Sequence, residues 1–114
     1  MSSLEFDISP IDALPKTARV VLNGAIDGSS VTIFEERLRQ LQADGYSNFV
    51  LDMAAIKYVN STGLGSLVST ADNLERLGGG FALIEVHPKV KVVFDMLGLN
   101  SFFKIFMDEV EAID

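Results

Sequence analysis

The chain has 114 residues, of which 48% are hydrophobic, and it carries a net charge of −7 and no cysteine. We expect one domain over residues 1–114, because this length leaves little room for a second core, and the apolar content excludes a disordered chain. The acidic balance opposes direct nucleic-acid binding, and the missing cysteine excludes disulfides and thiolate chemistry.

The sequence also lacks the signals of membrane, metal and common enzyme sites. The longest apolar runs, such as Phe81–Ile84, are too short to cross a bilayer, and the first residues do not resemble a signal peptide. His87 is the single histidine, and no ligand cluster has metal-site spacing. A phosphate-binding loop and a nucleophile elbow are missing too. We therefore expect a cytoplasmic protein with no membrane insertion, cofactor or metal. The usual motifs of an enzyme are missing, which disfavours catalytic activity without excluding it.

Strands are predicted from alternating or continuous apolar runs that are bounded by turn residues. Residues 4–8 alternate as a half-buried edge strand does, and a long loop with two prolines separates them from a second strand over residues 18–23. Gly24 is expected to end that second strand. Further strands are expected over residues 49–51, 81–86 and 102–106.

Between the strands, apolar residues recur at the spacing of one buried helical stripe. Ser30 or Thr32 is the expected N-cap of the first helix, where Glu35 follows Thr32 as in a capping box and pairs with Arg39 on the solvent side. Helices are expected from about residue 30 to Gly45, from Asn60 to Gly78, from Pro88 to Gly98 and, short and acidic, from Asp108. The order β-β-α-β-α-β-α-β-α predicts an α/β domain with a mixed sheet and crossover helices.

The segment Ile56–Leu67 is the most informative part of the sequence, because it places two hydroxyl groups at the start of a helix after a strand. A helix N-terminus presents unpaired N–H groups and partial positive charge, so it tolerates an added phosphate. Ser61 and Thr62 are therefore either helix caps or sites of modification. We expect Thr62 to cap the helix and Ser61 to be exposed.

Other candidate residues have both a structural and a functional interpretation. Gly63 and Gly65 lower helix propensity, so they either pack the first helical turn against a strand or give a partner a smooth surface. Asp27 either forms a turn or contacts a partner. Asp52, at the expected carboxyl end of a strand near the hydroxyl turn, is ambiguous in the same way.

Several segments, in order along nearly the whole chain, resemble the STAS domains of bacterial anti-sigma factor antagonists. The matching segments are Gly24–Asp27, Phe49–Asp52, the turn Tyr58–Gly65, the glycines Gly78 and Gly79, Val86–Val90 and Phe94–Leu99. The resemblance implies a freestanding STAS domain. It also implies a non-enzymatic protein that takes part in transcription regulation.

In this family, the unphosphorylated antagonist binds an anti-sigma factor that is also a serine protein kinase, and thereby releases a sigma factor. The resemblance implies that the kinase phosphorylates Ser61 and that a metal-dependent serine phosphatase reverses the modification. Asp27 matches an acidic position at the partner-binding edge. The implied partner-binding surface also includes the turn residues Asn60, Ser61, Thr62, Gly63 and Gly65. The family usually has aspartate where this chain has Asn60, a change that bears on kinase recognition.

Two other functions are open at this point. STAS domains also serve as scaffold subunits of stress-sensing complexes or as accessory subunits of lipid-transport ABC systems. A small enzyme acting through Asp27, Asp52 and Ser61 is a further alternative, but a serine nucleophile needs an activating base and the sequence places none near Ser61.

Overall fold

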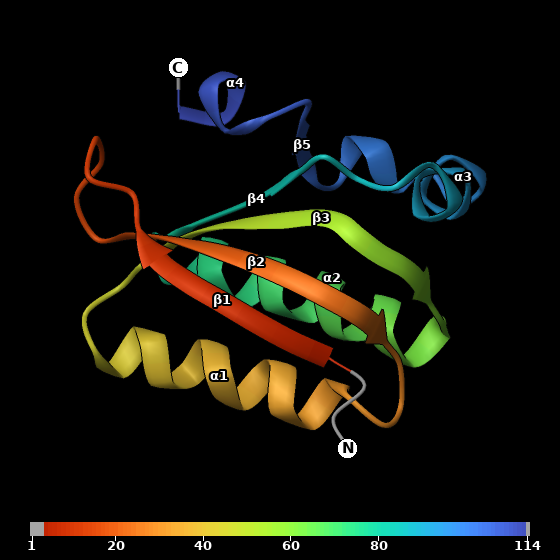
Figure 1. Cartoon of the computed structure of the whole chain (residues 1–114), viewed down its shortest axis with the longest axis horizontal. Helices are drawn as coiled ribbons and strands as arrows, with labels where there is room; N and C mark the ends of the chain where they lie inside the picture. Colours follow the sequence, from red (N-terminus) through yellow and green to blue (C-terminus); the bar gives the residue numbers. More distant parts are fainter. Residues whose placement is uncertain (1–3, 114) are drawn as a thin grey trace.

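The computed structural model describes residues 4–113, which form one five-stranded sheet flanked by helices (Figure 1). The strands lie in the sheet in the same order as in the chain. They are β1 (Leu4–Pro10), β2 (Thr17–Ile26), β3 (Asn48–Val59), β4 (Gly80–Ile84) and β5 (Lys104–Phe106). β1 is antiparallel to β2, and each later pair is parallel, so the sheet is mixed as the sequence predicts.

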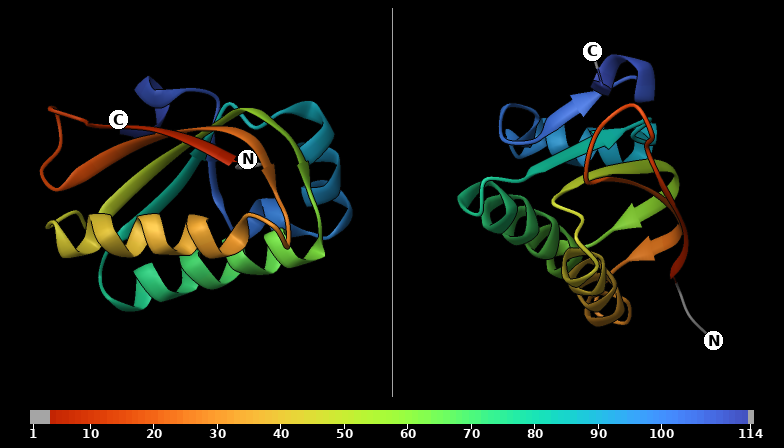
Figure 2. Two further views of the ribbon diagram at one scale, coloured as in Figure 1. Left: turned by 60° about the horizontal axis from the view of Figure 1, so that its bottom comes forward. Right: turned by 90° about the vertical axis from the view of Figure 1, so that its left-hand side faces the viewer.

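The two longest helices lie side by side on one face of the sheet, as both views in Figure 2 show. The short C-terminal helix lies on the opposite face, and a third helix packs beside β3. The helices are α1 (Val31–Ala43), α2 (Ser61–Arg76), α3 (Pro88–Met96) and α4 (Glu109–Ile113), with a 3-10 turn over Leu99–Ser101. The α/β class and the element order predicted from the sequence are confirmed.

The main core lies between the sheet and the α1–α2 layer. Alternate residues of each strand point into it, because successive side chains of a strand face opposite sides. Its fully buried members include Val20, Leu22, Phe34, Phe49, Leu51, Leu67 and Leu83. A smaller cluster on the other face holds α4 against the sheet and is built on Ile11, Val50 and Ile84. No helix within residues 4–113 is long and apolar enough to cross a membrane.

Several predicted strand boundaries are wrong. β4 ends at Ile84 rather than at residue 86, and β5 begins at Lys104 rather than at residue 102. β2 does not end at Gly24 but continues to Ile26, with Gly24 at a φ of 127° that favours glycine. β3 runs to Val59 rather than stopping after three residues. Pairing with the neighbouring strand extends both strands, because backbone groups at this depth need hydrogen-bond partners.

The predicted cap of α1 is also partly wrong. Ser30 occupies the N-cap position, so Thr32 lies inside the helix and does not cap it. The Ser30 side chain makes no capping hydrogen bond; its hydroxyl donates instead to the carbonyl oxygen of Ala25 at 2.7 Å. Ser30 is buried, and this bond ties the start of α1 to the end of β2.

Candidate functional site

The candidate site is formed where the carboxyl ends of β2 and β3 meet. The backbone N–H of Asn60 donates to the carbonyl oxygen of Ile26 at 3.3 Å, so the turn after β3 rests on the end of β2. Asp27 directly follows Ile26. The structure therefore brings the Asp27 loop and the Asn60–Gly65 turn to one edge, as parallel neighbouring strands require.

Asn60 is the N-cap of α2. Its backbone is extended, with φ −90° and ψ −177°, and its Oδ1 atom accepts a hydrogen bond from the Gly63 N–H at 2.9 Å. The helix begins at Ser61. The expectation that Thr62 caps the helix is therefore wrong, because the preceding asparagine already satisfies the N–H group that a cap would bind.

Ser61 and Thr62 are the first two residues of α2, and both are exposed. Within residues 4–113 neither hydroxyl has a hydrogen-bond partner, so neither is needed for capping. Both lie at the positive end of a helix of 16 residues whose first turn contains no acidic side chain. The local structure can therefore accept negative charge on either hydroxyl.

Gly63 and Gly65 have different roles. A Cβ atom on Gly63 would lie 2.6 Å from the carbonyl carbon of Ile26 and closer still to the oxygen, so only glycine lets α2 approach β2 this closely. A Cβ atom on Gly65 would have no neighbour within 4 Å, and the residue is exposed. Packing accounts for Gly63, whereas Gly65 leaves a smooth, open patch of helix.

Asp27 forms the turn that leads into α1. Its Oδ1 atom accepts hydrogen bonds from the Ser29 hydroxyl at 2.6 Å and from the Ser29 N–H at 2.9 Å. These bonds hold the pKa of Asp27 below its ordinary value, so the carboxylate stays charged beside the turn at neutral pH. The structural interpretation of Asp27 is correct, and its charge is also available at the edge of the site.

A hydrogen bond between α1 and α2 lies behind this edge. Ser66 is 7% exposed, and its hydroxyl donates to Oε2 of Glu35 at 2.9 Å. Glu35 thus faces α2, and the predicted pair with Arg39 does not form among the described residues. No local sequence pattern predicts this contact, because the two residues are 31 positions apart.

Asp52 does not belong to the site. Because β3 continues to Val59, Asp52 lies seven residues before the end of the strand, which is about 23 Å of extended chain. Its Oδ1 atom accepts from the Ala54 N–H at 3.0 Å within the same strand. The predicted placement of Asp52 near the hydroxyl turn is therefore wrong. Asp27, Asp52 and Ser61 do not come together as the proposed enzyme site would require. Within residues 4–113 no group of histidine and carboxylate side chains could hold a metal.

The fold and the sequence agree with one known family. The model of the STAS domain family matches residues 11–112. A curated relative, the anti-sigma F factor antagonist of Paenibacillus polymyxa, is 26% identical over 95 residues, which cover 82% of this chain and 81% of the relative. The chain belongs to the STAS domain family, and its curated relatives are anti-sigma factor antagonists rather than enzymes.

Solved structures show the same fold at low sequence identity. An anti-sigma factor antagonist from Mycobacterium paratuberculosis is 22% identical and superposes with a TM-score of 0.82 over 99% of this chain and 96% of its own. The Bacillus cell fate determinant SpoIIAA in its phosphorylated form is also 22% identical, with a TM-score of 0.70 over 96% of this chain and 97% of its own. The expected α/β STAS fold is thereby confirmed.

Proposed function

We propose that this protein is a phosphorylation-controlled anti-sigma factor antagonist and that Ser61 is its switch residue. In the unphosphorylated state it binds an anti-sigma factor that is also a serine kinase, and this binding releases a sigma factor. Phosphorylation of Ser61 ends the interaction, and a metal-dependent serine phosphatase restores it. The whole chain, residues 1–114, acts as one STAS domain in the cytoplasm, and it is not an enzyme.

The main support for this proposal is that different residues cap α2 and present the free hydroxyl group at its start. Asn60 supplies the cap, and Ser61 is left exposed at the first helical position. Ser66 is unsuited to modification because it is buried and bonded to Glu35. The resemblance to the family selects Ser61 over the equally exposed Thr62.

The same geometry supports a switch that acts on binding and not on folding. A phosphate adds about −1.5 to −2 charges, which the positive end of α2 tolerates in the free protein. A partner packed on Asp27 and the Asn60–Gly65 turn would have to desolvate that phosphate beside the ionised Asp27. Turning a mostly bound protein into a mostly free one requires a loss of affinity of about 100-fold, or about 2.7 kcal/mol. A single uncompensated interfacial charge commonly costs about 2–5 kcal/mol.

The test begins with a pull-down by the unmodified protein, followed by mass spectrometry of the captured partners and of Ser61. Titration calorimetry with the captured anti-sigma factor then compares three variants. Ser61→Ala should bind like the wild type, because it adds no charge. Ser61→Asp should bind roughly 10-fold more weakly, since aspartate has one charge and fewer acceptor oxygens than phosphate.

Ser69→Asp is the matched control, because Ser69 is exposed on the same helix eight residues further on, about 12 Å along its axis. It adds the same charge and should leave the affinity unchanged. Phosphopeptide mapping must place the modification on Ser61, and labelling must be lost in Ser61→Ala. Full labelling of Ser61→Ala, or tight binding by Ser61→Asp, would contradict the proposal.

A further inference from the structure

The face of the sheet opposite α1 and α2 contains a hollow of about 420 Å³ that the switch does not use. It lies at the starting ends of β3, β4 and β5, between α4 and the loop that joins β1 to β2. Its size falls within the range of about 300–1,000 Å³ that is typical of small-molecule sites. The side chains that shape it are Leu14, Pro15, Val50, Ala82, Phe106 and Ala112.

The floor of the hollow is part of one row of side chains that crosses the sheet. Arg19 pairs with Val50, Val50 with Ala82, and Ala82 with Lys104, so these four side chains lie on the same face. The two middle residues are apolar and the two ends are cationic. The small Ala82 leaves the floor low between Val50 and Lys104.

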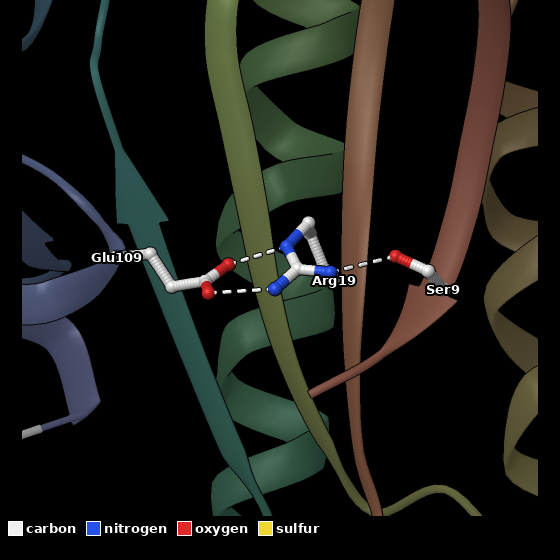
Figure 3. Close-up of polar contacts among 3 residues, drawn as sticks. All are labelled: Ser9, Arg19 and Glu109. Carbon is white, nitrogen blue, oxygen red and sulfur yellow. Dashed lines mark hydrogen bonds and ion pairs between the residues drawn. The ribbon is translucent and has the colours of Figure 1, made fainter. Parts of the chain in front are cut away.

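The cation at one end of the row is already neutralised. Arg19 donates from Nε and Nη2 to the two carboxylate oxygens of Glu109, at 2.5 and 2.6 Å, and from Nη1 to the Ser9 hydroxyl at 2.8 Å (Figure 3). This contact fixes α4 on the sheet, and Ala112 of α4 then forms a wall of the hollow. A contact within the chain therefore positions the α4 wall of the hollow.

The cation at the other end has no ion-pair partner among the described residues. Lys104 lines the hollow and is exposed, and within residues 4–113 no carboxylate lies within 4 Å of its ammonium group. A ligand that matches this arrangement has an unbranched apolar body for the floor at Ala82 and one negative charge for Lys104. A carboxylate on a hydrocarbon chain meets both conditions.

We propose that this hollow is a binding site for a medium-chain fatty acid. The hydrocarbon chain lies on Ala82 between Phe106 and the α4 wall, beside Val50, which α4 already covers, and the carboxylate pairs with Lys104. From Val50 to the end of β3 at Val59 is about 30 Å of extended strand, so the site is separate from the Ser61 turn. The two sites can be tested independently.

The test is a titration of the full chain with octanoate. Calorimetry measures the affinity, and amide chemical shifts locate the binding site. Binding should saturate at one site and shift the amides of Val50, Ala82, Phe106 and Ala112. Each methylene that enters the hollow is worth about fourfold in affinity, so octanoate should bind about 15-fold more tightly than hexanoate. Lys104→Gln should weaken octanoate binding by about two- to fivefold, as expected for an exposed ion pair. Lys89→Gln, on the exposed start of α3, is the charge-matched control and should have no effect.

Ala82→Leu should abolish binding, because the larger side chain fills the floor. The chain-length series needs no variant, so it decides the question even if Ala82→Leu does not fold. Three outcomes would each overturn the proposal. Octanoate and hexanoate could bind with equal affinity, octanoate and octanol could bind with equal affinity, or the chemical shifts could change only on other surfaces. Self-association of the chain through this face, detected by sedimentation, would also overturn it.

Discussion

Gly63→Ala tests how closely α2 is packed on β2. The added Cβ atom would lie 2.6 Å from the carbonyl carbon of Ile26. The obstacle is backbone in a paired strand and cannot rotate away as the end of a side chain would. The start of α2 must therefore shift, and the hydrogen bond from the Asn60 N–H to Ile26, which is 3.3 Å long, must lengthen or break.

The expected cost follows from three contributions. Overpacking costs about 1–3 kcal/mol, and loss of the backbone hydrogen bond costs about 1 kcal/mol. Against these, alanine gains up to about 1 kcal/mol over glycine in helix propensity. The free energy of unfolding of Gly63→Ala should therefore fall by about 1–3 kcal/mol.

Gly65→Ala is the matched control, because the same substitution two residues later meets open space. It should raise the free energy of unfolding by up to about 1 kcal/mol through helix propensity alone. Urea denaturation monitored by circular dichroism measures both stabilities. With a slope of about 1–3 kcal/mol/M, the midpoint of Gly63→Ala should lie below that of Gly65→Ala by at least about 0.3 M. Equal stabilities of the two variants would refute the close-packing explanation of Gly63.

Substitutions at two further residues test contacts made by α2 and α4. Asn60→Ala removes the cap of α2 and should lower the free energy of unfolding, measured by urea denaturation, by about 1 kcal/mol. Asn60→Asp should retain the stability of the wild type, because aspartate also caps helices. Equal losses of stability in both variants would show that Asn60 is no cap. Glu109→Gln should cost up to about 1 kcal/mol at pH 7, because the pair with Arg19 is partly exposed, and should speed amide exchange in α4. The hydrogen bond from Arg19 lowers the pKa of Glu109, so the wild-type advantage is complete above the ordinary carboxylate pKa and disappears as the pH falls through the lowered value. An advantage that persists in acid would exclude this ion pair as its source.

The helices were easier to predict from the sequence than the long strand β3. The stripes of α1 and α2 follow one regular period, and Gly45 and Gly78 mark their ends. In β3, register shifts against β2 add two residues, one between Asp52 and Ala55 and one between Ile56 and Tyr58. The buried positions after residue 52 are therefore 53, 56 and 59, a spacing of three that no alternating strand pattern would predict.

Within the site, the sequence predicted the turn but not its hydrogen bonds. Asn60, Ser61 and Thr62 are three consecutive residues that can each cap a helix, and the cap is decided by where β3 ends. The Glu35–Ser66 contact joins two helices and has no local signature. For Asp27 the sequence left a turn and a partner contact open; the turn does form, through local bonds to Ser29.

The strand order of the sheet, which repeats the order of the chain, has a consequence for synthesis on the ribosome. Each strand pairs with the strand made just before it, although a domain generally folds as one unit. The Asp27 loop and the Ser61 turn both belong to the part of the chain that ends with α2 at Arg76. Every residue of the edge that we assign to partner binding is therefore synthesised before β4, α3 and the segment that carries α4, which complete the core beneath it.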